Sequence, residues 1–283
     1  PPPAAVDPSF IRFSEDDHGA KLETAVAKYQ NAAGETVDLI GAVHLGDPGY
    51  YKGLNEAFKG YEVVLFELVG DPAGVQKPEA AGNAPKADAA ASILRGAQLM
   101  LTNMLQLQHQ VEGIDYTAPN FVHADLNWEQ FRALQKQKGE SFATLLRESM
   151  KAQAALAKEK KAAGKPPADE GGLGSILALV GALQGSDTSG LKLLMARQFK
   201  DAEEMMAKME GPDGTVIIAE RNKAALKVMD EQLGAGRKRL GIFYGAGHFA
   251  DMEKRLVERG FQRKETQWRT AWDIPKAVKK EAA

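Results

Sequence analysis

The stretch Val37-Asp38-Leu39-Ile40-Gly41-Ala42-Val43-His44 decides the fold that this sequence predicts. Its mostly apolar run is typical of a β-strand buried on both faces. Asp47 and Pro48 then suit the N-cap and the first position of a helix, which we expect to run to about Lys59. A second apolar run at 61–66 predicts another buried strand. The segment therefore forms a βαβ unit with parallel strands, and we expect these two strands to be neighbours.

The remaining core elements lie near the two ends of the chain. Apolar runs and alternating patterns predict strands, and apolar residues at helical spacing predict helices. The polar stretch 30–35 joins two of the strands as a hairpin. The predicted elements are strands at 10–13, 22–29, 239–244 and 262–272, and helices at 216–233 and 249–259. Together they predict an α/β fold with a mixed central sheet and flanking helices.

The middle of the chain predicts a helical cap inserted into this core. Residues 71–91 are rich in Pro, Gly, Ala and Lys and predict a loop. Asn127 and Gln130 suit a capping box at the start of a helix. Further helical patterns lie at 91–111, 142–163 and 191–209. The predicted organisation is a first core half at 1–70, the loop and cap at 71–212, and a second core half at 213–283.

Composition excludes several classes of protein. The net charge of −2 gives no basic face for nucleic acid, and the absence of cysteine excludes disulfides, zinc-thiolate sites and cysteine nucleophiles. The longest apolar run, 173–183, is too short to cross a bilayer, which needs roughly 20 residues. The lead-in at 1–8 suits a mature protein whose signal peptide has been removed, which predicts a secreted or periplasmic location. An arbitrary chain boundary is the alternative, and the sequence sets no oligomeric state.

Two segments of the same design end in histidine where a strand meets a helix. Gly41-Ala42-Val43-His44 ends one predicted strand, and Gly245-Ala246-Gly247-His248 ends another. Glu67 directly follows the strand at 61–66. Because ligands of open α/β sheets bind beyond the carboxyl ends of the strands, we expect both histidines and Glu67 to converge at one rim. A carboxylate beside an apolar run also needs a polar partner, since burying it unpaired is costly.

Each of these residues also has a purely structural explanation. A single histidine at a strand end is more often a hydrogen-bonded structural residue than a ligand. Glu67 alone suits a salt bridge to an arginine. Tyr50 and Tyr51, which open the helix after the first of the two segments, suit either the rim or the core. His18 lies among acidic residues and suits a solvated turn.

Several motifs follow one another in a fixed order along the chain. They are the paired G-x-x-H segments, Phe66-Glu67-Leu68, Glu220-Arg221-Asn222 and Tyr244-Gly245-Ala246-Gly247-His248-Phe249. This ordered set resembles the TraB/PrgY/GumN/TIKI family, within the broader erythromycin-esterase/ChaN-like group, and covers 36–70 and 213–262 best. The resemblance implies an EreA/ChaN-like sheet with a helical cap and a site at the strand ends. It also implies a TIKI-like, metal-dependent protease, with His44, His248 and Glu67 as the required residues and Arg221 as the helix arginine.

The chemistry of these side chains leaves two mechanisms open. Two neutral imidazoles and a carboxylate suit a divalent ion such as Mn, Co or Zn, which would activate water and polarise a carbonyl. Without a metal, one histidine is the general base, Glu67 orients it and Arg221 stabilises an oxyanion. A surface salt bridge is the alternative for Arg221. His123 is a candidate further ligand, and Tyr244 is a candidate cofactor-binding residue. The predicted function is a metal-dependent hydrolase of a peptide or small-molecule substrate with a peptide- or ester-like carbonyl.

Two other functions compete with hydrolysis. The first is a binding protein without turnover, for haem, metal or a signalling peptide, and the second is a scaffold that has lost the chemistry. ChaN-like relatives motivate haem binding, and PrgY-like relatives motivate peptide sequestration. A haem site needs a His or Tyr facing an apolar slot, for which the cap offers Met100, Met104, Leu105, Met205 and Met206. Core packing explains these apolar residues more simply.

Overall fold

The computed structural model describes most of the predicted core and part of the predicted cap. The described residues are 9–73, 105–140, 189–198 and 214–276, with the isolated positions 144, 147, 154 and 158. The lead-in at 1–8, on which the predicted location depends, lies outside them, as does the apolar run at 173–183. Most of the predicted loop at 71–91, most of the cap helices, and Met100, Met104, Met205 and Met206 also lie outside.

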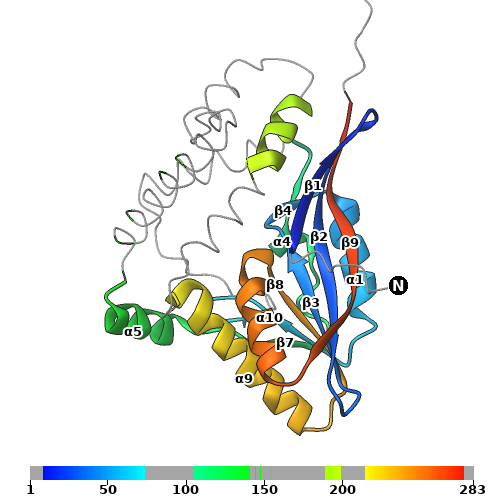
Figure 1. Ribbon diagram of the computed structural model, residues 1–283. Helices are drawn as coiled ribbons and strands as arrows, with labels where there is room; N and C mark the ends of the chain where they lie inside the picture. The colour runs from blue at the N-terminus through cyan, green and yellow to red at the C-terminus, as the bar shows by residue number, and fades with distance from the viewer. Residues whose placement is uncertain are drawn as a thin grey trace, which may run out of the picture.

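One mixed sheet forms the centre of the molecule (Figure 1). Its strands run in the order β1-β2-β3-β8-β5-β7, and β9 pairs with β2 as well. Strands β3, β8, β5 and β7 are parallel, whereas β1, β2 and β9 form antiparallel pairs. The bounds are Ile11–Glu15 (β1), Gly19–Gln30 (β2), Thr36–Ala42 (β3), Val63–Phe66 (β5), Phe121–His123 (β7), Arg239–Gly245 (β8) and Gln262–Pro275 (β9). The predicted mixed α/β sheet with flanking helices is confirmed.

The prediction that the two strands of the βαβ unit are neighbours is wrong. They are parallel, but β8 lies between β3 and β5, and Ile242 of β8 is in register with both Leu39 and Leu65. Strand β8 is apolar on both faces, and its side chains from Leu240 to Tyr244 are buried. A strand of this kind is most stable with a neighbour on each side. The central position therefore belongs to a strand that comes late in the sequence.

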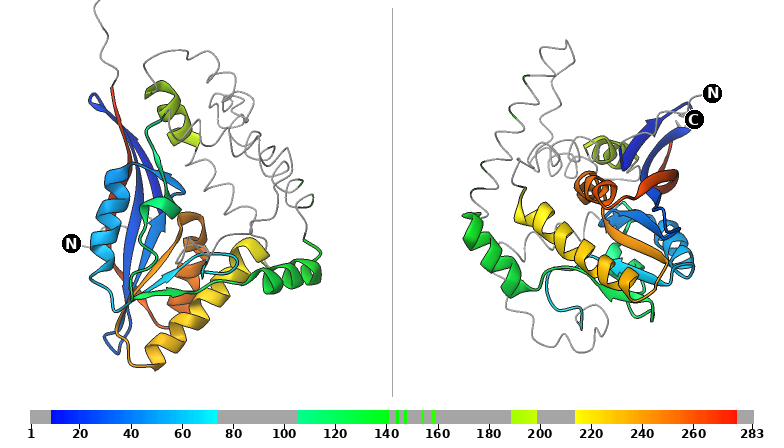
Figure 2. Two further views of the ribbon diagram at one scale, coloured as in Figure 1. Left: turned by 180° about the vertical axis from the view of Figure 1, so that it is seen from behind. Right: turned by 60° about the horizontal axis from the view of Figure 1, so that its bottom comes forward.

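Helices cover both faces of the sheet. Figure 2 shows α1 (Pro48–Phe58) on one face and α9 (Arg221–Gly234) with α10 (Phe249–Glu258) on the other. Asp47 stands at the N-cap of α1, as predicted, but its carboxylate does not cap the helix. It accepts hydrogen bonds from Lys192 Nζ at 2.6 Å and from the backbone N of Asp273 at 2.7 Å. The carboxylate thus links three distant segments instead of satisfying the first turn.

The middle segment contributes to the core as well as to a cap. Strand β7 at Phe121–His123 joins the central sheet, so the predicted cap at 71–212 contains a core strand. The predicted helix at 91–111 does not extend through its last residues, where β6 (Gln108–His109) pairs with β4 (Leu45–Gly46). The short helix α4 (Gln110–Gly113) follows. The predicted capping box of Asn127 and Gln130 is confirmed at the start of α5 (Trp128–Lys138). In the described segments, no helix combines the length and apolar character that a membrane crossing requires.

Candidate functional site

Polar side chains gather where the four parallel strands end. Glu67 directly follows β5, and Gly245 closes β8. His44 lies two residues beyond β3, and Asp125 lies two residues beyond β7. Since the carboxyl ends of parallel strands meet at one edge, the order of the strands brings Asp125, Glu67 and the residues after Gly245 together.

Glu67 is the central acid of this rim. Its Oε2 accepts a hydrogen bond from the backbone N of Gly245 at 2.7 Å, and its Oε1 accepts one from Arg221 Nη2 at 2.7 Å. Burial alone would raise the pKa of Glu67. The charge of a protonated His248, the charge of Arg221 and these hydrogen bonds favour the carboxylate more strongly, and the pKa falls to about 2. Glu67 is therefore ionised at neutral pH and is a weak base.

Arg221 joins Glu67 to a second carboxylate, that of Asp125. Arg221 donates to Asp125 through Nε at 3.0 Å and through Nη2 at 2.6 Å, in the forked geometry typical of strong arginine–carboxylate pairs. The Asp125 side chain has 0% of its surface exposed, and that of Arg221 has 9%. Burial alone would lower the pKa of Arg221, but the Asp125 hydrogen bonds and the charge of Glu67 raise it. Two carboxylates thus share one guanidinium in a buried setting.

A π-helical turn, η2 (Val216–Glu220), places Arg221 at this position. Turns of this type are rare and occur often at functional sites. Thr215 precedes η2, and its hydroxyl accepts a hydrogen bond from the backbone N of Ile218 at 3.2 Å. Helix α9 begins directly afterwards with Arg221, so the irregular turn lies immediately before the guanidinium that unites the rim.

His248 lies behind Glu67 in a defined protonation state. Asn222 Nδ2 donates to the backbone O of His248 at 3.0 Å and to Asp251 at 2.8 Å, which leaves Asn222 Oδ1 as an acceptor. This oxygen lies 2.7 Å from His248 Nδ1, so Nδ1 carries the proton and Nε2 has the lone pair. Burial lowers the pKa of His248, which favours the neutral ring. Nε2 lies 3.7 Å from Glu67 Oε1 and 3.5 Å from Arg221 Nη1. We call Glu67, Asp125, Arg221, Asn222 and His248 the rim cluster.

A small pocket opens beside the rim cluster. We call it the rim pocket; its volume is about 160 Å³, and it is lined by His44, Glu67, Leu68, Val69, Gln110, Val111, Tyr116 and Arg221. The His44 side chain is exposed, whereas its backbone O accepts a hydrogen bond from the backbone N of Gln110 at 2.9 Å. Tyr51 is buried and donates to the backbone O of Val43 at 2.8 Å. Packing and this hydrogen bond therefore fix the chain on both sides of His44.

The predicted convergence is thus partial. Glu67, His248 and Arg221 contact one another, whereas His44 lines the same pocket as Glu67 and Arg221. The two G-x-x-H segments differ in structure, because His248 closes a 3-10 turn, η3 (Ala246–His248), and is buried. Identical spacing gives one exposed and one buried histidine, since the chain after β8 turns inward and the chain after β3 pairs with β6.

The rim cluster does not fit the predicted metal in this arrangement. The Arg221 guanidinium contacts both atoms that a metal would join, because Nη2 lies 2.7 Å from Glu67 Oε1 and Nη1 lies 3.5 Å from His248 Nε2. Among the residues that the structure describes, no three His, Asp or Glu side chains form a group that could hold a metal ion. A divalent cation would have to displace the guanidinium, at a cost in charge repulsion. The metal site stays a prediction that titration can test.

The two candidate accessory residues have other contacts. The ring of Tyr244 is buried, its hydroxyl donates to the backbone O of Ala124, and it packs edge-on against His248 at 5.2 Å between ring centres. Tyr244 therefore supports the rim cluster from behind. His123 Nε2 lies 2.6 Å from the backbone O of Leu68 and is its donor, because a carbonyl oxygen can only accept.

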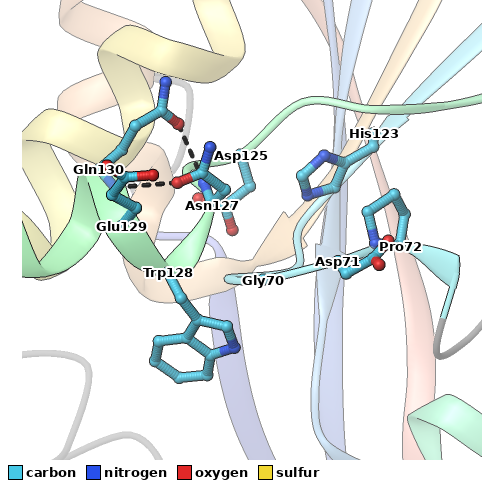
Figure 3. Close-up of a pocket in the computed structure, with 9 residues that line it drawn as sticks. All are labelled: Gly70, Asp71, Pro72, His123, Asp125, Asn127, Trp128, Glu129 and Gln130. Atoms are coloured by element: carbon cyan, nitrogen blue, oxygen red, sulfur yellow. Dashed lines mark hydrogen bonds between the residues drawn. The ribbon is translucent and has the colours of Figure 1, made fainter. Parts of the chain in front are cut away.

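His123 lines a second pocket of about 460 Å³ instead of the rim pocket. Figure 3 shows Trp128 at one side of this second pocket and His123, Asp71 and Pro72 at another. Trp128 is 55% exposed and lies over Gly70, where a Cβ would come within 2.7 Å of the indole nitrogen. Leu68 and Val69 line the rim pocket and Gly70 lines the second pocket, so the two are neighbours along the chain.

Four polar residues of the site were not predicted from the sequence: Asp125, Asn222, Gln110 and Tyr116. Asp125 had a usable signal, because it follows the apolar pair Phe121-Val122 much as Glu67 follows its strand. That pair was too short to predict a strand. Asn222 adjoins Arg221 in the quoted motif. Gln110 and Tyr116 carry no sequence signal, since the β4–β6 pairing alone brings their segment to the rim.

Comparisons of the chain with protein-family models, with curated proteins and with solved structures found no match. The resemblance to the TraB/PrgY/GumN/TIKI family, and the EreA/ChaN-like form of the fold, therefore stay predictions.

Proposed function

We propose that this protein is a hydrolase that cleaves a peptide- or ester-like carbonyl bond in the rim pocket. One observation carries the proposal: a buried, charged cluster at the strand ends borders a pocket that also contains an exposed imidazole, that of His44. Buried charges are costly, and active sites are where proteins concentrate them. The metal-dependent protease implied by the family resemblance is the more specific form of the same proposal.

The protonation states of the pocket side chains determine which of them can transfer a proton. Glu67, with a pKa of about 2, is too weak a base to activate water at neutral pH. The Nε2 lone pair of His248 faces Arg221 and Glu67 inside the protein. His44 is the pocket imidazole that solvent reaches, and we assign proton transfer to it. Its ring accepts a proton from water as the water oxygen bonds to the carbonyl carbon. The imidazolium then returns the proton to the leaving atom as the bond from carbon to that atom breaks.

Arg221 suits the stabilisation of the developing oxyanion. Its Nε and Nη2 groups are held by carboxylates, whereas Nη1, among the residues that the structure describes, makes two long contacts, to the backbone O of Ile217 and to His248 Nε2, both at 3.5 Å. Nη1 therefore retains capacity for another acceptor. Positioned donors of this kind typically contribute about 10²–10³ in rate.

The test is hydrolysis of a panel of nitrophenyl esters and aminoacyl nitroanilides by wild type, His44→Ala and His18→Ala. His18 is an exposed histidine of the turn before β2, as predicted, and is the matched control. We expect His44→Ala to lower kcat roughly 10²–10⁴-fold and His18→Ala to change nothing. Equal activity in both variants would refute the role of His44.

Each assay is repeated after chelation and with added Mn, Co or Zn. Activity that requires one of these ions would favour the metal-dependent form.

A binding protein without turnover is the second candidate. The observation that favours it is the His44 ring, for which the described residues show no orienting hydrogen bond, whereas general bases are usually oriented by a third group. The rim pocket suits a small ligand or a peptide side chain, because its volume is below the roughly 300–1,000 Å³ of pockets for drug-sized ligands. For the same reason haem does not fit it. Saturable ligand binding with no product formation would favour this candidate.

A further inference from the structure

The wall of the rim pocket holds a buried amide whose hydrogen bonds are incomplete. Gln110 is 8% exposed, and its Nε2 donates to the hydroxyl of Tyr116 at 2.9 Å. Its Oε1 is buried and has no hydrogen-bond partner among the described residues. A buried polar atom without a partner costs free energy, so such an atom in a pocket wall calls for an explanation. Neither the rim cluster nor the proposed proton transfer uses it.

The pair presents one donor and one acceptor in either orientation of the amide. As placed, the Tyr116 hydroxyl accepts from Nε2 and keeps its own hydrogen to donate, while Gln110 Oε1 is buried without a partner among the described residues and meets a ligand only when the amide turns. With the amide turned over, Tyr116 donates to Oε1, and the pair then offers the N–H groups of Nε2 and a lone pair of the Tyr116 oxygen. Burial raises the pKa of Tyr116 to about 12, so the hydroxyl stays protonated at neutral pH. The terminal torsion of glutamine is soft, which lets the amide turn toward a ligand.

The charge of the surroundings sets a second condition on the ligand. Glu67 and Asp125 share the single guanidinium of Arg221, and His248 is neutral, so the rim cluster carries a surplus of negative charge. A ligand group that is already anionic when it binds at Gln110 and Tyr116 is disfavoured by this charge, whereas the oxyanion of the proposed hydrolysis forms only during the reaction, at Arg221 Nη1. The matching ligand group is therefore uncharged and has an acceptor and a donor side by side.

We propose that Gln110 and Tyr116 recognise a primary carboxamide or a lactam in the rim pocket. Both groups carry C=O and N–H along one edge, complementary to the acceptor and donor of the pair. A trans peptide bond carries them on opposite edges and does not match, and an ester has no donor. The volume of about 160 Å³ suits a group of this size. This inference rests on the proposed function in taking the rim pocket as the substrate site, and it names the group by which the substrate is held there, beside the peptide- or ester-like bond that is cleaved.

Binding of four small probes tests the assignment: acetamide, 2-pyrrolidinone, acetate and ethyl acetate. Each is titrated into the full chain and followed by NMR chemical shifts. We expect acetamide and 2-pyrrolidinone to bind and to shift the signals of Gln110 and Tyr116. Ethyl acetate should bind roughly tenfold more weakly, since one hydrogen bond is lost, and acetate more weakly still. Equal or tighter binding of acetate or ethyl acetate overturns the assignment.

Variants separate recognition from folding and from catalysis. Gln110→Met and Tyr116→Phe should each weaken acetamide binding roughly tenfold. Val257→Ala, at an exposed apolar position of α10 outside the pocket, should leave binding unchanged. Binding unchanged in both Gln110→Met and Tyr116→Phe overturns the proposal; a thermal melt checks that each variant is folded.

His44→Ala should still bind acetamide, so binding without hydrolysis refutes only the proposed function. Hydrolysis without preference for the amide probes refutes only the recognition by Gln110 and Tyr116.

Discussion

At the residue scale, the site depends on how two carboxylates share Arg221. Asn in place of Asp125 replaces the buried, charge-assisted hydrogen bonds to Arg221 with weaker ones, whereas Glu67 still pairs with the guanidinium. We therefore expect Asp125→Asn to reduce the free energy of unfolding by about 1–3 kcal/mol, measured by urea denaturation. The matched control is Asp230→Asn. Asp230 pairs with Arg259 at 3.4 Å on the surface, and its loss should cost under about 1 kcal/mol. Similar small losses in both variants would show that the buried pair is not a stabilising element.

The same residues predict that acid destabilises the protein. The pKa of Glu67 falls from 4.5 to about 2 on folding, and the pKa of His248 falls below 6.5. In both cases the unfolded chain binds protons more readily, so stability rises with pH. The contribution of Glu67 to stability is present above pH 4.5 and is lost as the pH falls toward 2. Thermal melts against pH should therefore show a flatter acid limb in Glu67→Gln than in wild type. Parallel curves would contradict the shifted pKa.

Sequence reasoning found the titratable residues better than it found their partners. Glu67, Arg221 and His248 were predicted site residues, and they contact one another in the structure. Asp125 and Asn222 were not predicted, although they fix the guanidinium and the imidazole tautomer. A chemical type at a strand end can be recognised in a sequence. Its hydrogen-bond partners come from other elements and depend on packing.

At the element scale, α1 holds the end of β3 through two tyrosines. Tyr50 donates to the backbone O of Gly41 at 2.7 Å, and Tyr51 donates to that of Val43 at 2.8 Å. Both rings are buried, so of the two predicted roles core packing is the one observed. Their hydroxyls nevertheless determine where the chain leaves the sheet at His44.

Tyr51→Phe tests this coupling between α1 and the site. The change leaves a buried carbonyl oxygen unpaired, which costs about 1–3 kcal/mol, and it loosens the segment that carries His44. We expect both stability and kcat to fall. The control is Tyr29→Phe, because Tyr29 donates to Glu253 at 2.7 Å on the other side of the sheet. That variant should lose stability alone. A fall in kcat of the same size in Tyr29→Phe would mean that the effect is global.

Local patterns predicted most elements of the described core. The strands, α1, α9, α10 and the capping box of α5 follow from apolar periodicity and end signals. Asp47 shows the limit of such signals, because Lys192 and the backbone of Asp273 bind its carboxylate instead of the helix end. The spacing of apolar residues at 216–233 predicted one regular helix and did not indicate the π-helical turn before Arg221.

At the scale of the whole molecule, the order of strands determines the site. Strand β8 between β3 and β5 puts Gly245 and His248 beside Glu67 and moves His44 one strand further away. No local sequence pattern contains this order. It depends on which strand buries the most apolar side-chain surface on its two faces. The sequence therefore predicted the right rim with the wrong neighbours.

Hydrogen exchange tests the predicted order directly. Strand β8 has a parallel partner on each side, whereas β2 is the one partner of β1 within the described part of the chain. We expect the amides at 240–244 to exchange at rates close to global unfolding and those of β1 to exchange much faster. Exchange as fast in β8 as in β1 would contradict its central position.

The most direct test of the account is the kcat/KM of Glu67→Gln beside that of Glu62→Gln, for any substrate that the wild type hydrolyses. The two acids flank β5, and both accept backbone N–H groups, Glu62 from Lys238 and Arg239 and Glu67 from Gly245. Glu62 precedes β5 and Glu67 follows it, so the two acids lie at opposite ends of the strand. We predict that Glu67→Gln lowers kcat/KM by roughly 10²-fold or more, because the amide no longer holds Arg221 by its charge. We predict that Glu62→Gln leaves kcat/KM within about twofold, since Glu62 lies outside the rim. A folded Glu67→Gln variant with wild-type kcat/KM would contradict the claim that the strand-end rim is the functional site.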